Sequence, residues 1–350
     1  MIQEHGGDIW LYGGCLDFST NISPLGTPES VKQAYLECAG NLTWYPEPDS
    51  TSLCRAIAGY ENVPEDSVIC GNGAAELIYS VVQVLHPNTA LVAVPSFGEY
   101  EKALHSVNAC VRRYFLREDR GFILEDAFTE EISGDVQMVF LCSPNNPTGR
   151  LAPVDLLEKI LARCRETGTL LFLDECFNDF TTDPDAVSMK KYLAEYSNLF
   201  ILKAFTKKAG IAGLRLGYGL CGNKEIMDKV RRHSPCWNVS LPAQAAGMAA
   251  LKEQDFYKRN REIVFRERPF LTRVLENAGF HVFPSDANFL LFKGGGGLFE
   301  SMLKQKILIR DCEGFDGLEK GFYRIAVKTH EENLLFEKAL RRICLERSGK

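Results

Sequence analysis

Residues 204–218, AFTKKAGIAGLRLGY, decide the fold class because they join two short apolar runs through a loop rich in glycine and cationic side chains. The two runs, Leu199–Lys203 and Leu216–Cys221, have the length and composition of buried strands. A lysine at the end of such a strand, as at Lys207, can be partly desolvated and become a nucleophile toward carbonyls. Arg215 offers a planar fork that suits a phosphate. Either residue alone is more often a surface charge, so the sequence around them is needed to decide whether they bind a ligand.

That pattern continues outward over residues 67–233, where short apolar runs alternate with longer helical stretches. The other expected strands are Ser67–Cys70, Ala90–Val94, Gln137–Cys142 and Thr169–Leu173. The expected helices are Ala74–Leu85, Pro153–Thr167, Val187–Tyr196 and Lys224–Arg232. Apolar strands with helices between them predict an α/β fold whose mostly parallel sheet is covered on both faces. Such sheets bind ligands beyond the carboxyl ends of their strands.

After Pro242 the pattern becomes mixed. We expect helices at Ala243–Gly279, Leu298–Lys306 and His330–Cys344, and strands at His281–Phe283, Asn288–Phe292, Ile307–Arg310 and Tyr323–Val327. Near the N-terminus only one helix, Pro28–Ala39, is clear. The sequence therefore predicts a large domain over residues 40–240 and a smaller α+β domain made of residues 1–39 and 241–350.

Three further loops after predicted strands carry unusual residues. Residues 71–76, GNGAAE, bring small residues to a helix N-terminus, where backbone N–H groups can approach an anion. Residues 143–149, SPNNPTG, are either a plain turn or a rigid mount for an amide donor. Asp174 and Glu175 follow an apolar strand, where a carboxylate is either a helix N-cap or the partner of a cationic ligand.

The four loops together suit one ligand that carries a phosphate, a phenolic oxygen, a pyridinium nitrogen and an aldehyde. Pyridoxal 5′-phosphate has all four groups. SPNNPTG, the DE pair and TKKAGIAGLRLGY also occur in the order seen in fold-type-I, aspartate-aminotransferase-like enzymes, and the chain resembles that family over nearly its whole length. The resemblance implies the fold-type-I transferase fold with this cofactor.

The resemblance also implies roles for individual residues. Lys207 would bind the cofactor covalently, Asp174 would pair with the ring nitrogen and Asn146 would hydrogen-bond the ring hydroxyl. Phe97 would stack on the ring. The cofactor phosphate would lie among Gly73, Ala74, Ala75, Thr206 and Arg215. Tyr45 would reach the neighbouring subunit's cofactor phosphate, which implies a homodimer with its active site at the subunit interface.

Two branches of the family fit best, the histidinol-phosphate aminotransferases and the L-threonine-O-3-phosphate decarboxylases of cobalamin nucleotide-loop assembly. HGGD at 5–8, DFSTNISPLG at 17–26, Phe177 and PCWNV at 235–239 resemble the decarboxylases. This likeness implies loss of CO₂ from a phosphorylated amino acid. The substrate would be bound by His5, Asn21, Arg310 and Arg324. The aminotransferase alternative stays open, since both branches share Lys207 and Asp174. A non-catalytic binding protein would be expected to lack one of those two.

Composition narrows the remaining classes of function. The chain has 350 residues, 45% of them hydrophobic and 25% charged, which excludes a disordered chain. A net charge of −6 without long basic runs argues against nucleic-acid binding, and no apolar stretch is long enough to predict a membrane span. The N-terminal residues lack a signal-peptide pattern, so we expect a cytoplasmic enzyme. The 12 cysteines lie mostly in apolar strings without CxxC pairs, which predicts free buried thiols and no structural metal.

Overall fold

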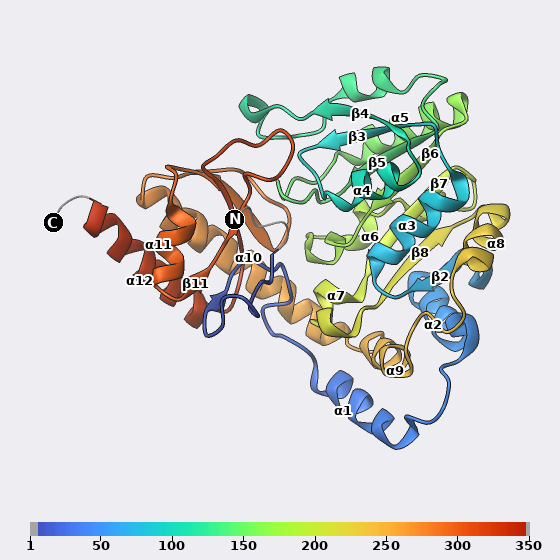
Figure 1. Ribbon diagram of the computed structural model, residues 1–350, viewed down its shortest axis with the longest axis horizontal. Coiled ribbons are helices and arrows are strands. Elements are labelled where there is room, and N and C mark those ends of the chain that lie inside the picture. The colour runs from blue at the N-terminus through green and yellow to red at the C-terminus, as the bar shows by residue number, and fades with distance from the viewer. Residues whose placement is uncertain (1–5, 348–350) are drawn as a thin grey trace.

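The computed structural model describes residues 6–347, and its centre is a seven-stranded sheet in the order β2-β8-β7-β6-β5-β3-β4 (Figure 1). All its pairs are parallel except those of β8, which runs antiparallel to β2 and β7. The predicted α/β fold with a mostly parallel sheet is confirmed. The strands are β2 (Val68–Gly71), β3 (Thr89–Val94), β4 (Cys110–Phe115), β5 (Met138–Cys142), β6 (Leu170–Asp174), β7 (Leu199–Ala204) and β8 (Gly217–Cys221).

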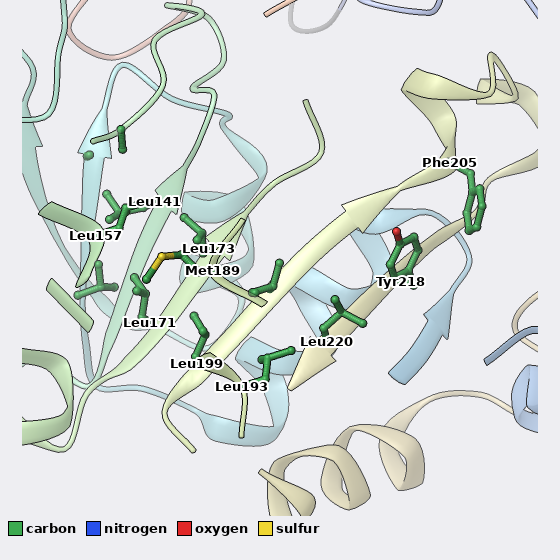
Figure 2. Close-up of a cluster of buried hydrophobic side chains, with 14 of the residues drawn as sticks. Leu141, Leu157, Leu171, Leu173, Met189, Leu193, Leu199, Phe205, Tyr218 and Leu220 are labelled. Atoms are coloured by element: carbon green, nitrogen blue, oxygen red, sulfur yellow. The ribbon is translucent and has the colours of Figure 1, made fainter. Parts of the chain in front are cut away.

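Alternate strand residues supply two cores, one on each face of this sheet. Leu171 and Leu173 of β6 join the cluster that Figure 2 shows, whereas Leu170 and Phe172 join the cluster on the other face. This alternation is the period of two that strand geometry imposes, and burial of both faces explains why the strands read as continuous apolar runs. The first cluster includes residues of α2 (Thr51–Glu61) and α5 (Val154–Thr167), and the second includes residues of α3 (Ala74–Leu85), α4 (Glu99–Ser106) and α8 (Lys224–His233).

Two predictions for the large sheet need correction. Strand β4 was not expected because it lies at the sheet edge, where Arg112 and Arg113 break any apolar run. The helix expected over Val187–Tyr196 is wrong. The chain instead forms a short α6 (Pro184–Val187) and a 3₁₀ turn at Met189–Tyr192, because the Ser188 hydroxyl donates to Glu175 and also accepts from the Lys190 backbone.

The C-terminal part forms a four-stranded antiparallel sheet in the order β12-β13-β10-β9. Residues of this sheet contribute to a third hydrophobic core cluster of the molecule, which is separate from the two clusters of the large sheet. The elements are β9 (His281–Val282), β10 (Phe289–Lys293), α11 (Leu298–Lys304), β11 (Ile307–Leu308), β12 (Arg310–Asp311), β13 (Phe322–Ala326) and α12 (His330–Arg347).

The single helix expected over Ala243–Gly279 is wrong, because the chain forms α9 (Leu241–Ala250) and α10 (Gln254–Asn277) with a break between them. The Tyr257 hydroxyl donates to the Ala250 carbonyl across this break, at 2.7 Å. The break redirects the chain. Helix α9 packs in the core of the large sheet, and α10 runs from there toward the small sheet (Figure 1).

The N-terminal segment contacts both parts of the molecule. Strand β1 (Leu16–Asp17) pairs with β11, and α1 (Glu29–Glu37) packs on α9. The boundaries proposed for the two domains stay a prediction. Within residues 6–347, no helix is long and apolar enough to cross a membrane, and no cluster of acidic, His and Cys side chains could hold a metal ion.

Candidate active site

A cavity of about 900 Å³ lies at the carboxyl ends of the parallel strands, where the small sheet faces the large one. Loops after β3, β5 and β7 line one side, and β12, β13 and the N-terminal segment line the other. This is where a sheet of this type is expected to bind its ligand. The predicted residues that line the cavity are Asn21, Ala75, Phe97, Asn146, Thr206, Lys207, Arg215, Arg310 and Arg324.

Lys207 lies on α7 (Phe205–Lys208), a single turn of helix that directly follows β7. Its carbonyl accepts a hydrogen bond from Ser23 N at 2.9 Å, which ties the N-terminal segment to this loop. Its ammonium lies 5.5 Å from the ring centre of Phe177. Burial lowers the pKa of Lys207, and the neighbouring Arg324 and Arg215 act in the same direction, which favours a neutral, nucleophilic amine.

Lys208 has a different environment although it is the next residue. Its side chain does not line the cavity, and its Nζ forms an ion pair with Asp179 at 3.1 Å. Burial opposes the charge of Lys208, but Asp179 and the nearby Tyr60 outweigh it and raise its pKa. A lysine held in the charged state is a poor nucleophile. The geometry therefore separates the two lysines that the sequence places side by side.

Asp174 ends β6 and is buried just behind the cavity lining. Its Oδ2 accepts from the Tyr100 hydroxyl at 2.6 Å, and its Oδ1 accepts from Cys176 N at 2.9 Å. The adjacent Glu175 belongs to another set of contacts, because its Oε2 lies 3.5 Å from Lys203 Nζ and accepts from Ser188 Oγ at 2.7 Å. The DE pair thus provides one carboxylate near the cavity and one in the core.

The start of α3 has the form of an anion cradle. Gly73 precedes the helix with φ +83°, and no side chain caps the first turn. A Cβ on Gly73 would lie 2.4 Å from Arg215 Nη2, so only glycine lets the guanidinium lie across the helix N-terminus. Ala75, Thr206 and Arg215 face the cavity there, whereas Gly73 and Ala74 contribute backbone outside its lining. Uncapped N–H groups next to an arginine suit a phosphate.

Arg324 reaches the cavity from β13 and is 6% exposed. It donates to the Asn146 side-chain oxygen and, at 2.8 Å, to the Ser19 carbonyl. Its Nε is buried without a hydrogen-bond partner, and so is Oδ1 of Asn21 on the same wall. Within residues 6–347, no carboxylate forms an ion pair with Arg324. A buried guanidinium of this kind can bind an anionic ligand.

Tyr45 and His5 are the two predicted residues that remain. Tyr45 is 76% exposed and stacks on Trp237, with ring centres 4.4 Å apart. His5 lies outside the described residues. Their proposed roles, toward a second subunit and the substrate, stay predictions.

Sequence reasoning missed Tyr100 and Phe315. Tyr100 binds Asp174, and the ring centre of Phe315 lies 5.3 Å from the Arg310 guanidinium carbon. The only sequence signal for Tyr100 was its position three residues after Phe97, at the start of a helix. Phe315 lies in a loop without regular structure, so no periodicity marked it.

Comparison with known proteins identifies the family of this fold. The family model described as aminotransferase class I and II matches residues 14–343. The chain belongs to this aminotransferase family. The family relationship confirms the predicted fold type and pyridoxal phosphate as the cofactor.

Three relatives of this aminotransferase-family chain are informative. The threonine-phosphate decarboxylase of Salmonella typhimurium is 35% identical and aligns over 94% of this chain and 91% of its own length. The crystal structure of a Clostridium acetobutylicum histidinol-phosphate aminotransferase has a TM-score of 0.88 at 32% identity, covering 95% of this chain and 99% of its own. An L-threonine-O-3-phosphate decarboxylase structure from Porphyromonas gingivalis has a TM-score of 0.82 at 29% identity, covering 93% and 98%. Both branches are thus near. The Salmonella typhimurium decarboxylase has the highest identity of these three, and the aminotransferase has the higher TM-score of the two structures.

Proposed function

We propose that this enzyme decarboxylates L-threonine O-3-phosphate to (R)-1-amino-2-propanol O-2-phosphate. The observation that carries the proposal is a pair of buried arginines, Arg310 and Arg324, that face the same cavity as Lys207. The substrate carries a carboxylate and a phosphate, so it offers one anion to each guanidinium. The identity of 35% with a threonine-phosphate decarboxylase supports the same assignment.

The residues around the cavity fit the cofactor. Lys207 would hold it covalently, Asp174 would face its ring nitrogen, Asn146 its hydroxyl and Phe97 its ring face. The uncapped start of α3, with Gly73, Ala74, Ala75, Thr206 and Arg215, would hold its phosphate. When bound, pyridoxal phosphate stabilises the electron pair that remains at Cα after a bond there breaks.

The chain's own side chains would then decide which Cα bond breaks. Arg310 and Arg324 would bind the two substrate anions, with His5 and Asn21 beside them. Holding two anions fixes the rotation of the substrate about its Cα, and so places either the carboxylate or the hydrogen for cleavage. Lys207 would take up the proton that the substrate's ammonium group gives up, and would deliver it to Cα after CO₂ has left. The lowered pKa of its ammonium favours this transfer.

The alternative within the family is a histidinol-phosphate aminotransferase. It is favoured by the TM-score of 0.88 with the Clostridium acetobutylicum enzyme, against 0.82 with the Porphyromonas gingivalis decarboxylase. An assay of the loaded enzyme separates the two activities. A decarboxylase releases CO₂ from threonine phosphate without a keto acid, whereas an aminotransferase consumes 2-oxoglutarate in step with histidinol phosphate and releases no CO₂.

We further propose a homodimer. Large apolar side chains are exposed on α1, on the loop that follows it and near α9, and a second copy of the chain would cover them. They are Tyr35, Leu36, Leu42, Trp44, Tyr45, Trp237 and Met248. Tyr45 would then reach the partner's cofactor phosphate. Sedimentation velocity tests this, since a dimer has twice the mass of the 39.2 kDa chain.

A cytoplasmic location is the remaining part of the proposal. All 12 cysteines are free thiols, which is typical of proteins from a reducing compartment. Fractionation of cells that express the tagged protein tests this location. Recovery in the periplasmic or membrane fraction would contradict it.

A further inference from the structure

Tyr100 lies between two residues that are expected to contact the cofactor ring. Its hydroxyl donates to Asp174 Oδ2 at 2.6 Å. Its ring meets the ring of Phe97 edge to face, with centres 5.7 Å apart and planes at 84°. Tyr100 is fully buried and is absent from the cavity lining, so any effect that it has on the cavity passes through neighbouring side chains.

The Tyr100 ring has a fixed place because it packs on a row of aromatic side chains. It stacks on Phe140 at 5.1 Å and 17°, and Phe140 is followed by Phe172 and Phe200 at centre distances of 4.7 and 5.0 Å. These three phenylalanines are register partners on β5, β6 and β7. The hydroxyl is therefore held by the same strands whose ends carry Asn146, Asp174 and Lys207.

The hydrogen bond from Tyr100 has a defined direction. Burial, Asp174 and Cys142 all raise the pKa of Tyr100, so its hydroxyl keeps its proton and donates it. Cys176 N donates to the other carboxylate oxygen. Hydrogen bonds to both oxygens fix the orientation of the Asp174 carboxylate.

We propose that Tyr100 is a positioning residue that holds the Asp174 carboxylate toward the cofactor's ring nitrogen and couples it to Phe97. The inference rests on the proposed function, because it takes Asp174 as the partner of that nitrogen. Tyr100 lies three positions after Phe97 and 74 before Asp174 in the chain, and it would act without touching substrate or cofactor.

The test compares Tyr100→Phe with Tyr257→Phe in the cofactor-loaded enzyme. Both variants lose one buried hydroxyl, but that of Tyr257 donates to the Ala250 carbonyl, away from the cavity. Three properties are measured: the visible circular dichroism of bound pyridoxal phosphate, the rate at which the cofactor dissociates, and kcat and KM separately. The first two need no substrate, so they remain informative if the proposed reaction is wrong.

For Tyr100→Phe we expect an altered visible circular dichroism, faster cofactor loss and a kcat about tenfold lower or more, with KM within about threefold. Tyr257→Phe leaves all of these unchanged. On an Asp174→Ala background with excess cofactor, Tyr100→Phe adds no further change in dichroism or dissociation rate. The substitution keeps the ring that contacts Phe97, and the hydroxyl that it removes no longer has the carboxylate to hold. The proposal is overturned if Tyr100→Phe matches Tyr257→Phe in all three properties. It is also overturned if Tyr100→Phe changes the dichroism and the dissociation rate by the same amount with and without Asp174→Ala. A wild type that releases no CO₂ while Tyr100→Phe still alters the cofactor signals refutes the decarboxylase alone.

Discussion

Arg310 and Arg324 are direct register partners on the antiparallel strands β12 and β13, and both are buried beside the same cavity. Like charges placed opposite each other destabilise a sheet. Burial lowers the pKa of Arg324 to about 10, and the charge of Arg310 lowers it too. An anionic ligand would offset this repulsion, which is why the pair is the strongest sign of a substrate with two negative groups.

Arg324→Ala should lower kcat/KM for threonine phosphate by about 100-fold or more, roughly 3 kcal/mol, because one substrate anion stays desolvated and unpaired. Cofactor affinity should change little. With less control over the Cα bond, a trace of amino transfer to 2-oxoglutarate should appear. The control is Arg342→Ala on α12, whose side chain is 69% exposed. If Arg324→Ala processes threonine phosphate as well as wild type does, Arg324 is not a substrate anchor.

Lys207→Ala should affect activity, whereas Lys208→Ala should affect stability. The first should abolish turnover and leave a folded protein, since it removes the amine that lines the cavity. The second should keep the chemistry but lower the free energy of unfolding by roughly 3 kcal/mol, because Asp179 loses its ion-pair partner. Turnover assays and urea unfolding of both variants check this pair of outcomes. Near-normal activity in Lys207→Ala would move the catalytic assignment to Lys208.

Asp174→Asn should retain some cofactor and lower kcat by about 100-fold or more, because a neutral amide no longer favours a protonated ring nitrogen. The single amide oxygen can accept from Tyr100 or from Cys176 N, so the variant should lose one of these two hydrogen bonds but keep the shape of the side chain. The absorbance of bound cofactor in the purified variant measures how much cofactor it retains, and a turnover assay measures its kcat. An unchanged kcat would mean that the ring nitrogen is protonated in another way.

Glu61→Gln should reveal a pH-dependent contribution to stability. Burial opposes the charge of Glu61, but Lys203, Lys208 and Lys190 outweigh it and lower its pKa from 4.5 to about 2. A depressed carboxyl pKa stabilises the folded state above pH 4.5, and this contribution is lost as the pH falls toward 2. The variant should therefore be about 3 kcal/mol less stable than wild type at pH 7, and the gap should shrink below pH 4.5.

Urea unfolding of both proteins at pH 7, 5 and 3 measures that gap. Glu65→Gln is the matched control, because its exposed pair with Arg55 should contribute little at any pH. A difference in the free energy of unfolding between Glu61→Gln and wild type that stays constant from pH 7 to pH 3 would contradict a lowered pKa for Glu61.

Local patterns could predict much of the fold. Strands buried on both faces, such as β6 and β7, appear in the sequence as continuous apolar runs. The edge strand β4 does not, since its exposed side chains leave it without such a run. The break between α9 and α10 has the Tyr257 hydroxyl on the Ala250 carbonyl across it, a tertiary contact that helical periodicity does not encode.

In the candidate site, too, some residues could be predicted from local sequence and others depend on tertiary contacts. Lys207, Asp174 and Asn146 follow strands, and loops after strands are where ligands bind, so their positions could be predicted. The contact of Tyr100 with Asp174 spans 74 residues, and that of Glu61 with Lys203 spans 142. Such long-range pairs form only when the whole sheet has assembled, and the sequence around one residue does not indicate which distant residue it will contact.

A single-turnover experiment on the wild-type enzyme tests the central claim most directly. The loaded enzyme, in excess, is mixed with L-threonine O-3-phosphate labelled in the carboxyl group, with no keto acid present. The account predicts about one labelled CO₂ per substrate and a phosphorylated amino alcohol as the product. Label that stays in the carboxyl group, together with amination of 2-oxoglutarate from histidinol phosphate in a parallel reaction, would contradict the account and establish the aminotransferase.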